Sequence, residues 1–171
     1  WEMHAEFVTY TLFLAGVSRV PFSGEMSTVF PEDWLAAMPG KVVTSALVRV
    51  VTADEEAAER LIVEDFPQWF VLESAAVARV VDAEAVIAGD FRIDEHGHER
   101  FAVLASPHVG RRRLGRIVQR VLEIETYKAM SLLTLPVARH VAMTVGRLDR
   151  ELAEIVASMA AATGHEAQTL Q

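Results

Sequence analysis

The amino-acid sequence predicts an α+β fold, in which an antiparallel sheet of four or five strands with two short helices precedes a long C-terminal helical hairpin. Apolar, β-branched stretches separated by short polar connections dominate the chain between residues 41 and 105. From residue 107 onward, apolar residues recur at intervals of three and four, as in amphipathic helices. The composition, 51% hydrophobic and 23% charged, is that of a globular protein.

The strands are expected at residues 1–14, 41–51, 69–81, 85–94 and 99–105. The last three follow one another across short polar connections, which favours an antiparallel meander. Short helices are expected at residues 32–38 and 52–65, the second because Thr52 and Glu55 have the spacing of a capping box.

The helical region is predicted to fold as a hairpin with coiled-coil character. Pro136 has no amide hydrogen and disfavours helical geometry in Leu135, so Thr134–Pro136 should form a tight turn or a kink. We therefore expect a sheet domain at 1–106, a helical hairpin at 107–163 and a polar tail at 164–171, and we expect the natural chain to extend beyond both ends of this sequence.

The second helix carries apolar residues at alternating spacings of three and four, which we call the apolar seam: Ala138, Val141, Val145, Leu148, Leu152, Ile155, Met159 and Ala162. This periodicity is typical of a coiled coil. The seam needs a partner, which could be the preceding helix folded back, a helix beyond residue 171, or a second protomer. Self-association or binding of a partner helix is thus expected through Val145, Leu148, Leu152 and Ile155.

Charge is divided unevenly along the chain. The net charge is −8, which argues against nucleic-acid binding. Residues 54–95 hold twelve acidic residues and three arginines, whereas residues 108–150 hold nine basic and three acidic residues. The basic helices are therefore expected to dock on the acidic part of their own domain or of a neighbouring copy. No apolar run is long enough to span a bilayer, so this piece is expected to be soluble by itself.

Two polar strand faces are candidates for a binding site. Glu2, His4 and Glu6 alternate with apolar residues, and a similar face is formed by Asp90, Arg92 and Asp94. If these strands are neighbours, the side chains could bind a small ligand or a metal, or catalyse hydrolysis. The alternative is a solvated ladder of cross-strand charge pairs.

The remaining histidine motif and the composition provide no evidence for a metal site or a catalytic site. His96 and His98 flank Gly97, a pattern better explained by a hairpin turn than by a metal site. The absence of cysteine excludes disulfides, thiolate zinc sites and a cysteine nucleophile. The chain has no glycine-rich phosphate loop and no Gly-x-Ser-x-Gly elbow, so the sequence assigns no catalytic residue, metal or cofactor.

Two features of the first long helix require oppositely charged groups nearby. Its N-terminal turns are rich in arginine, where the helix dipole already favours anions: Arg111, Arg112, Arg113, Arg116 and Arg120. The acidic half of the domain, an anionic lipid surface, or RNA or a phosphate ligand could balance this charge. Glu125 lies in the middle of the apolar side with Lys128 close by, so it must be paired or protonated. Pairing would fix the register of the hairpin, and a functional acid is the alternative.

Several segments resemble the bacterial family known as domain of unknown function 3422. They are Trp1–Phe7 with Tyr10 and Thr11, Gly89–Ile93, Arg113–Tyr127 and Leu135–Arg139. The resemblance implies a mixed domain followed by long helices and by downstream membrane segments, and hence association of the full-length protein with the bacterial inner membrane. It implies no activity. The expected function is therefore a non-enzymatic interaction or scaffolding domain, and the alternative is a ligand-binding or metal-binding, possibly hydrolytic, domain that uses Glu2, His4, Glu6 and Arg92.

Overall fold

A computed structural model describes the backbone of residues 1–16, 21–22 and 30–169, and the side chains of these residues except Glu32 and residues 160–169. The chain divides into two compact units. Unit 1 comprises Trp1–Lys41 and Ser45–Leu114, and unit 2 comprises Val42–Thr44 and Gly115–Gln171.

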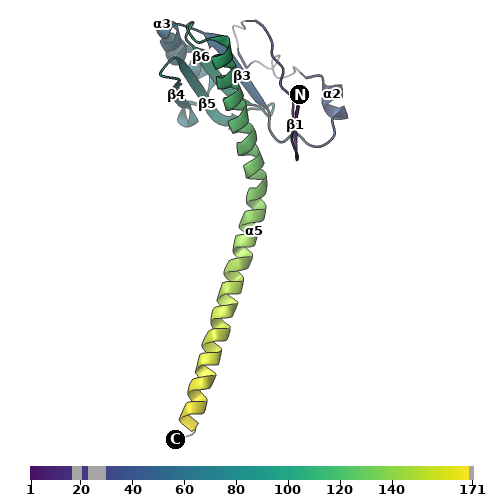
Figure 1. Ribbon diagram of the computed structural model, residues 1–171, viewed down its shortest axis with the longest axis vertical. Coiled ribbons are helices and arrows are strands. Elements are labelled where there is room, and N and C mark those ends of the chain that lie inside the picture. Colours follow the sequence, from purple (N-terminus) through teal and green to yellow (C-terminus); the bar gives the residue numbers. More distant parts are fainter. Residues whose placement is uncertain (17–20, 23–29, 170–171) are drawn as a thin grey trace. The chain divides into compact units, whose positions relative to one another are not determined.

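Unit 1 is built on a four-stranded mixed sheet with the strand order β3-β6-β5-β4 (Figure 1). The strands are β3 (Ala46–Thr52), β4 (Ala76–Val80), β5 (Ala85–Ile93) and β6 (Glu99–Ala105). The pairs β4–β5 and β5–β6 are antiparallel, which confirms the predicted meander. However, β3 runs parallel to β6, with Val50 opposite Val103, so the prediction of a purely antiparallel sheet is wrong.

The parallel pair follows from the helical crossover between β3 and β4. This crossover contains α3 (Glu55–Arg60), the π-helical η1 (Leu61–Asp65), α4 (Phe66–Trp69) and the 3₁₀ turn η2 (Leu72–Ser74). A helical crossover delivers the next strand in the direction of the previous one. The chain then reverses direction twice, from β4 to β5 and from β5 to β6. Strand β6 therefore runs in the same direction as β3, with which it pairs.

The core of unit 1 joins this crossover to the sheet. Apolar side chains that alternate along β5 and β6 pack with aromatic residues of the crossover, in a cluster of Phe66, Trp69, Phe70, Val86, Ala88, Ala102 and Leu104. Asp54 caps α3 by accepting a hydrogen bond of 2.8 Å from the amide of Ala57. The predicted helix at 52–65 is therefore present, although Asp54 provides the side-chain cap.

The N-terminal segment forms a small hairpin instead of the long strand predicted at residues 1–14. Strands β1 (Glu2–Met3) and β2 (Val8–Thr9) pair with each other in a separate two-stranded sheet. The turn between them is closed by a hydrogen bond of 2.9 Å from the amide of His4 to the carbonyl of Phe7. Helix α2 (Glu32–Ala37) lies within the helix predicted at residues 32–38.

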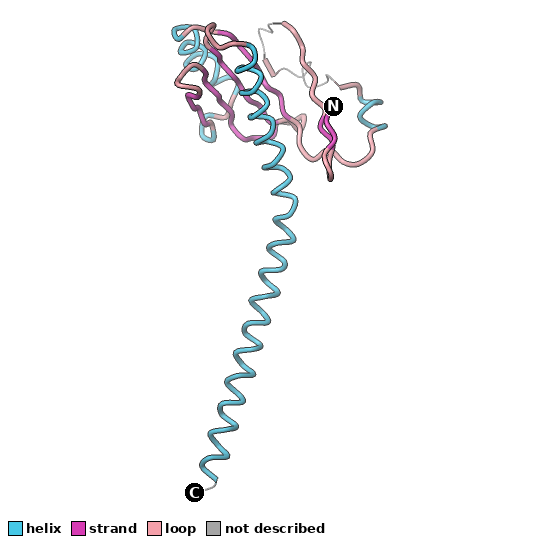
Figure 2. The backbone as a smooth tube through the Cα atoms, viewed as in Figure 1, coloured by secondary structure: helices cyan, strands magenta, loops and turns pink. Residues whose placement is uncertain are grey.

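Helix α5 (Arg111–Thr169) is one helix of 59 residues that continues through Pro136 (Figures 1 and 2). The predicted helical hairpin is therefore wrong. Proline costs a helix interior about 3 kcal/mol, but the segment around it has none of the Gly, Asn or Asp residues that favour a reversal. Two hydroxyls bind carbonyls just before the proline: Thr134 donates to Ser131 (2.8 Å) and Ser131 donates to Tyr127 (2.7 Å).

Residues 164–169 of the tail predicted at 164–171 are also helical, and the described backbone ends at Thr169. Among the described residues, no helix is both long enough and apolar enough to cross a membrane.

Strand β5 contains an irregularity that requires glycine. Its register with β6 shifts between Gly89 and Ile93, and Phe91 has a positive φ of 54°. A Cβ atom on Gly89 would lie 2.7 Å from Cδ1 of Phe101 and 3.1 Å from the carbonyl oxygen of Arg100. The glycine therefore allows close packing against β6 at the start of this bulge.

We expect Gly89→Ala to lower the free energy of unfolding by about 1–3 kcal/mol, because the added methyl group overpacks the contact with Phe101. Gly115→Ala is the matched control, since a Cβ there meets nothing within 4 Å. Because alanine favours a helix interior over glycine, this control should raise the free energy of unfolding by about 0.5–1 kcal/mol. Urea denaturation followed by circular dichroism measures both, and equal stability of the two variants would contradict the close approach at Gly89.

Candidate functional site

The two predicted polar faces are not neighbours. Glu2 lies in β1 and His4 and Glu6 lie in the turn that follows it, whereas Asp90 and Arg92 lie in β5 of the other sheet. β1 pairs with β2, whereas β5 pairs with β4 and β6. Glu2 and Glu6 are exposed, and the half-buried ring of His4 stacks on Phe7 with the ring centroids 4.2 Å apart. A joint site would require β1 to pair with β5. Among the described residues these strands belong to different sheets, so the pairing on which the predicted site depended is absent.

Asp90 lies at the centre of the best-defined polar cluster in unit 1. Its side chain is completely buried, and Oδ2 accepts hydrogen bonds of 2.9 Å from the amide of Val71 and from Nη2 of Arg100. Oδ1 accepts a hydrogen bond of 3.2 Å from the amide of Arg92. A buried carboxylate is stable only when donors of this kind replace water. The cluster therefore holds the end of the helical crossover, the β5 bulge and β6 together.

Arg92 has a different environment from Asp90, although the sequence places both on one polar face. It is exposed, and its Nε donates a hydrogen bond of 3.1 Å to Oγ of Ser74. The bulge at Phe91 explains the difference, because an extra residue breaks the alternation of side chains along a strand. Apart from Gly89, nothing in the sequence indicates this bulge.

The histidine motif forms the turn between β5 and β6. Oδ1 of Asp94 accepts hydrogen bonds of 2.9 Å from the amides of His96 and His98, and Gly97 has a φ of +86°, which confirms the turn prediction. Within the described part of the chain, no group of three or more His, Asp or Glu side chains is placed to hold a metal ion.

Ser45 and His98 make a contact that sequence reasoning missed, because 53 residues separate them. Oγ of Ser45 lies 2.7 Å from Nδ1 of His98, and both residues are half-buried. A serine hydroxyl beside an imidazole is the nucleophile-and-base pair of a catalytic triad, which also needs a third group to orient the base. The nearby carboxylate of Asp94 binds backbone amides of the turn, so it does not serve as the acid that orients a catalytic imidazole.

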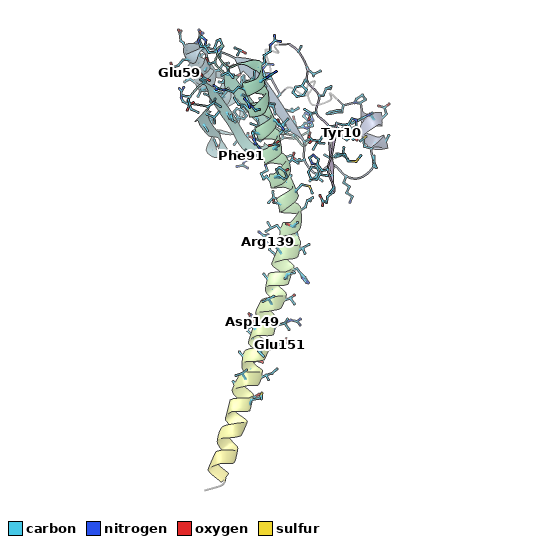
Figure 3. All side chains as sticks on the ribbon, in the orientation of Figure 1. Tyr10, Glu59, Phe91, Arg139, Asp149 and Glu151 are labelled. Atoms are coloured by element: carbon cyan, nitrogen blue, oxygen red, sulfur yellow. The ribbon has the colours of Figure 1, made fainter. Side chains whose placement is uncertain are left out.

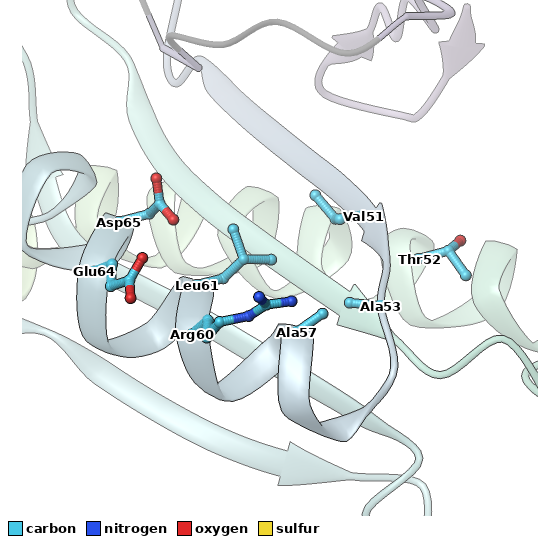
Figure 4. A pocket seen from close by; sticks show the side chains of 8 residues that line it. All are labelled: Val51, Thr52, Ala53, Ala57, Arg60, Leu61, Glu64 and Asp65. Carbon is cyan, nitrogen blue, oxygen red and sulfur yellow. The ribbon is translucent and has the colours of Figure 1, made fainter.

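A hollow of about 350 Å³ lies between the end of β3 and the first helical turns of the crossover (Figure 4). Its lining residues are Val51, Thr52, Ala53, Ala57, Arg60, Leu61, Glu64 and Asp65. The carboxylates of Glu64 and Asp65 lie at one end of the hollow in Figure 4, and Thr52 and Ala53 lie at the other. Arg60 and Glu64 are exposed, so this hollow lacks the convergent polar groups that fix a ligand.

Glu125 is a buried charge in unit 2. It is 3% exposed, accepts a hydrogen bond of 2.6 Å from Oγ1 of Thr44 and forms an ion pair with Lys128. This contact ties the short segment Val42–Thr44 to α5. From the sequence we expected the pairing of Glu125 to fix the register of a helical hairpin. It cannot do so, because α5 does not turn back.

The arginines at the start of α5 are all exposed, and two of them form short ion pairs. Arg113 lies 2.7 Å from Glu84, which belongs to the acidic part of the chain, and Arg120 lies 2.7 Å from Glu123 one turn along the helix. The Arg113 pair is one contact of the kind expected between the basic and acidic regions.

The apolar seam is exposed. The exposed fractions of Val145, Leu148, Leu152 and Ile155 are 49%, 52%, 60% and 55%. By contrast, Ile117, Val118, Val121 and Ala129, earlier in the same helix, are each less than 9% exposed. Figure 3 shows Asp149 and Glu151 projecting from the seam region of α5. The side chain of Ala162, the last seam residue, lies outside the described residues.

We expect Asp90→Ala to lower the free energy of unfolding by about 3–5 kcal/mol, because Arg100 and two backbone amides lose their acceptor. Glu95→Ala is the control for loss of one carboxylate, since the Glu95 side chain is 87% exposed and lies 3.6 Å from His96. The control should change stability by less than about 0.5 kcal/mol. Urea denaturation compares the two variants, and a similar small loss for both would show that the Asp90 cluster is not structural.

Comparison with known proteins identifies the family. The family model described as "Protein of unknown function (DUF3422)" matches residues 1–171. No curated protein and no solved structure matches the chain significantly. The match spans the whole sequence and agrees with the resemblance of the Gly89–Ile93 and Arg113–Tyr127 segments, so the chain belongs to the DUF3422 family.

Proposed function

We propose that this chain is a non-enzymatic interaction or scaffolding domain that assembles through the apolar seam of α5. The observation that carries the proposal is the exposure of Val145, Leu148, Leu152 and Ile155 on one stripe of a continuous helix. Monomeric soluble proteins seldom expose apolar surface in such a contiguous arrangement, and exposed contiguous surfaces commonly mark binding sites.

The energetics of the helix favour a partner. Isolated helices in water gain little from backbone hydrogen bonds alone, and most helical stability in proteins comes from packing of the apolar face. Full burial of one Leu, Ile or Val side chain contributes about 1.5–3 kcal/mol. Since the seam side chains are about half exposed, burying the rest of each one against a partner would contribute a large part of that free energy to association.

The polar clusters support a structural role better than a catalytic one. Asp90 is saturated by three donors, and Asp94 binds the turn instead of the His98 ring. The competing proposal of a ligand-binding or hydrolytic site at Glu2, His4, Glu6 and Arg92 has less support. The first three residues lie in β1 and the turn that follows it, whereas Arg92 lies in β5 of the other sheet.

The proposal includes anchoring of the full-length protein to a membrane, which rests on the family resemblance alone. In such a protein the seam would bring several anchored copies or partners together. Fractionation of cells that express the full-length protein tests this part, and recovery in the soluble fraction would contradict it.

We expect Leu148→Gln with Leu152→Gln to abolish association, because two apolar layers of the seam are lost. Arg147→Gln with Arg150→Gln is the matched control, since it places the same side chains on the polar face of the same helical segment. Sedimentation velocity over a range of concentrations measures association. The seam variant should sediment as a monomer and the control as an oligomer.

Circular dichroism checks that both variants keep the structure of unit 1. The proposal fails if the unsubstituted chain is monomeric at high concentration, or if the seam variant associates as strongly as the control.

A further inference from the structure

We propose that the occupant of the apolar seam is a second copy of this chain, bound in parallel and in register. This inference rests on the proposed function and specifies its partner. The charges that border the seam carry it, because they allow one orientation of two identical helices and oppose the other.

The seam defines heptad positions along α5. Val145 and Leu152 occupy position a, and Leu148 and Ile155 occupy position d. Asp149 then occupies position e and Glu151 position g, so a carboxylate lies on each side of the stripe. Both side chains belong to exposed residues and project from the helix in Figure 3.

The antiparallel arrangement brings like charges together. The antiparallel register with the greatest overlap of the seam places Val145 opposite Ile155 of the other copy and Leu148 opposite Leu152. Positions e then face e, and g face g. Asp149 would lie opposite Asp149, and Glu151 opposite Glu151. Like charges that face each other across an interface are destabilising.

The parallel arrangement avoids this repulsion. In parallel coils, a residue at g faces position e of the following heptad on the other helix. Glu151 then lies opposite Val156, and Asp149 lies opposite Thr144, neither of which is charged. Each apolar layer pairs a residue with its own counterpart, so the seam is complementary to itself.

Engineered disulfides distinguish the orientations, since the chain has no cysteine of its own. In the parallel arrangement, Val145→Cys alone and Ile155→Cys alone should each form a disulfide-linked dimer under mild oxidation. In the antiparallel register, two copies of either substitution are about 15 Å apart along the axis, which exceeds the Cα separation of about 7 Å that a disulfide tolerates. Only a mixture of the two variants would then cross-link.

Arg147→Cys, on the polar face, gives the background rate of cross-linking by random collision. Efficient cross-linking of both single seam variants above this background supports the parallel dimer. Cross-linking of the mixture alone overturns the parallel inference but leaves assembly through the seam intact. A monomer in sedimentation together with background cross-linking throughout overturns both proposals.

A charge substitution tests the same geometry without a disulfide. We expect Thr144→Lys to tighten self-association about three-fold, because the new ammonium group faces Asp149 of the other copy twice in each dimer. Thr144→Gln is the uncharged control and should leave the dissociation constant nearly unchanged. In the antiparallel register Thr144 faces Ser158, so an unchanged dissociation constant for Thr144→Lys would contradict the parallel arrangement.

Discussion

The buried carboxylate of Asp90 is the interaction on which unit 1 depends. Its donors come from the chain after α4, from the β5 bulge and from β6, so one side chain links the helical crossover to two parts of the sheet. A charge removed from water is tolerated only while its donors stay in place. The positions of these three segments are consequently interdependent, and the strained backbone at Phe91 is held by the same contacts.

The sequence predicted the local elements of unit 1 better than their pairing. Runs of β-branched residues located β3, β5 and β6, and polar connections located the turns, because both signals arise from neighbouring residues. The parallel alignment of β3 and β6 depends on packing of Phe66 and its neighbours over the sheet, which no local pattern specifies. The contact between Ser45 and His98 was unpredictable for the same reason.

The helical region shows a different balance. The sequence pattern correctly placed Glu125 on the buried apolar side of the helix, since helix periodicity alone determines which side chains share a face. By contrast, helix periodicity does not determine whether the chain turns or stays helical at Pro136. Its cost competes with the cost of ordering a reversal, and a segment of leucine, threonine and valine residues that offers no turn former remains helical.

The period of the apolar seam along the continuous helix α5 also determines the handedness of a coiled coil built on it. An undistorted α-helix has 3.6 residues per turn, whereas the seam repeats every 3.5, so the stripe drifts by about 20° in each heptad. Over the three heptads from Ala138 to Met159, the stripe of a straight helix would rotate away from its partner by about 60°. Two such helices stay in contact only by winding around each other to the left, so the spacing of the apolar residues specifies a left-handed superhelix.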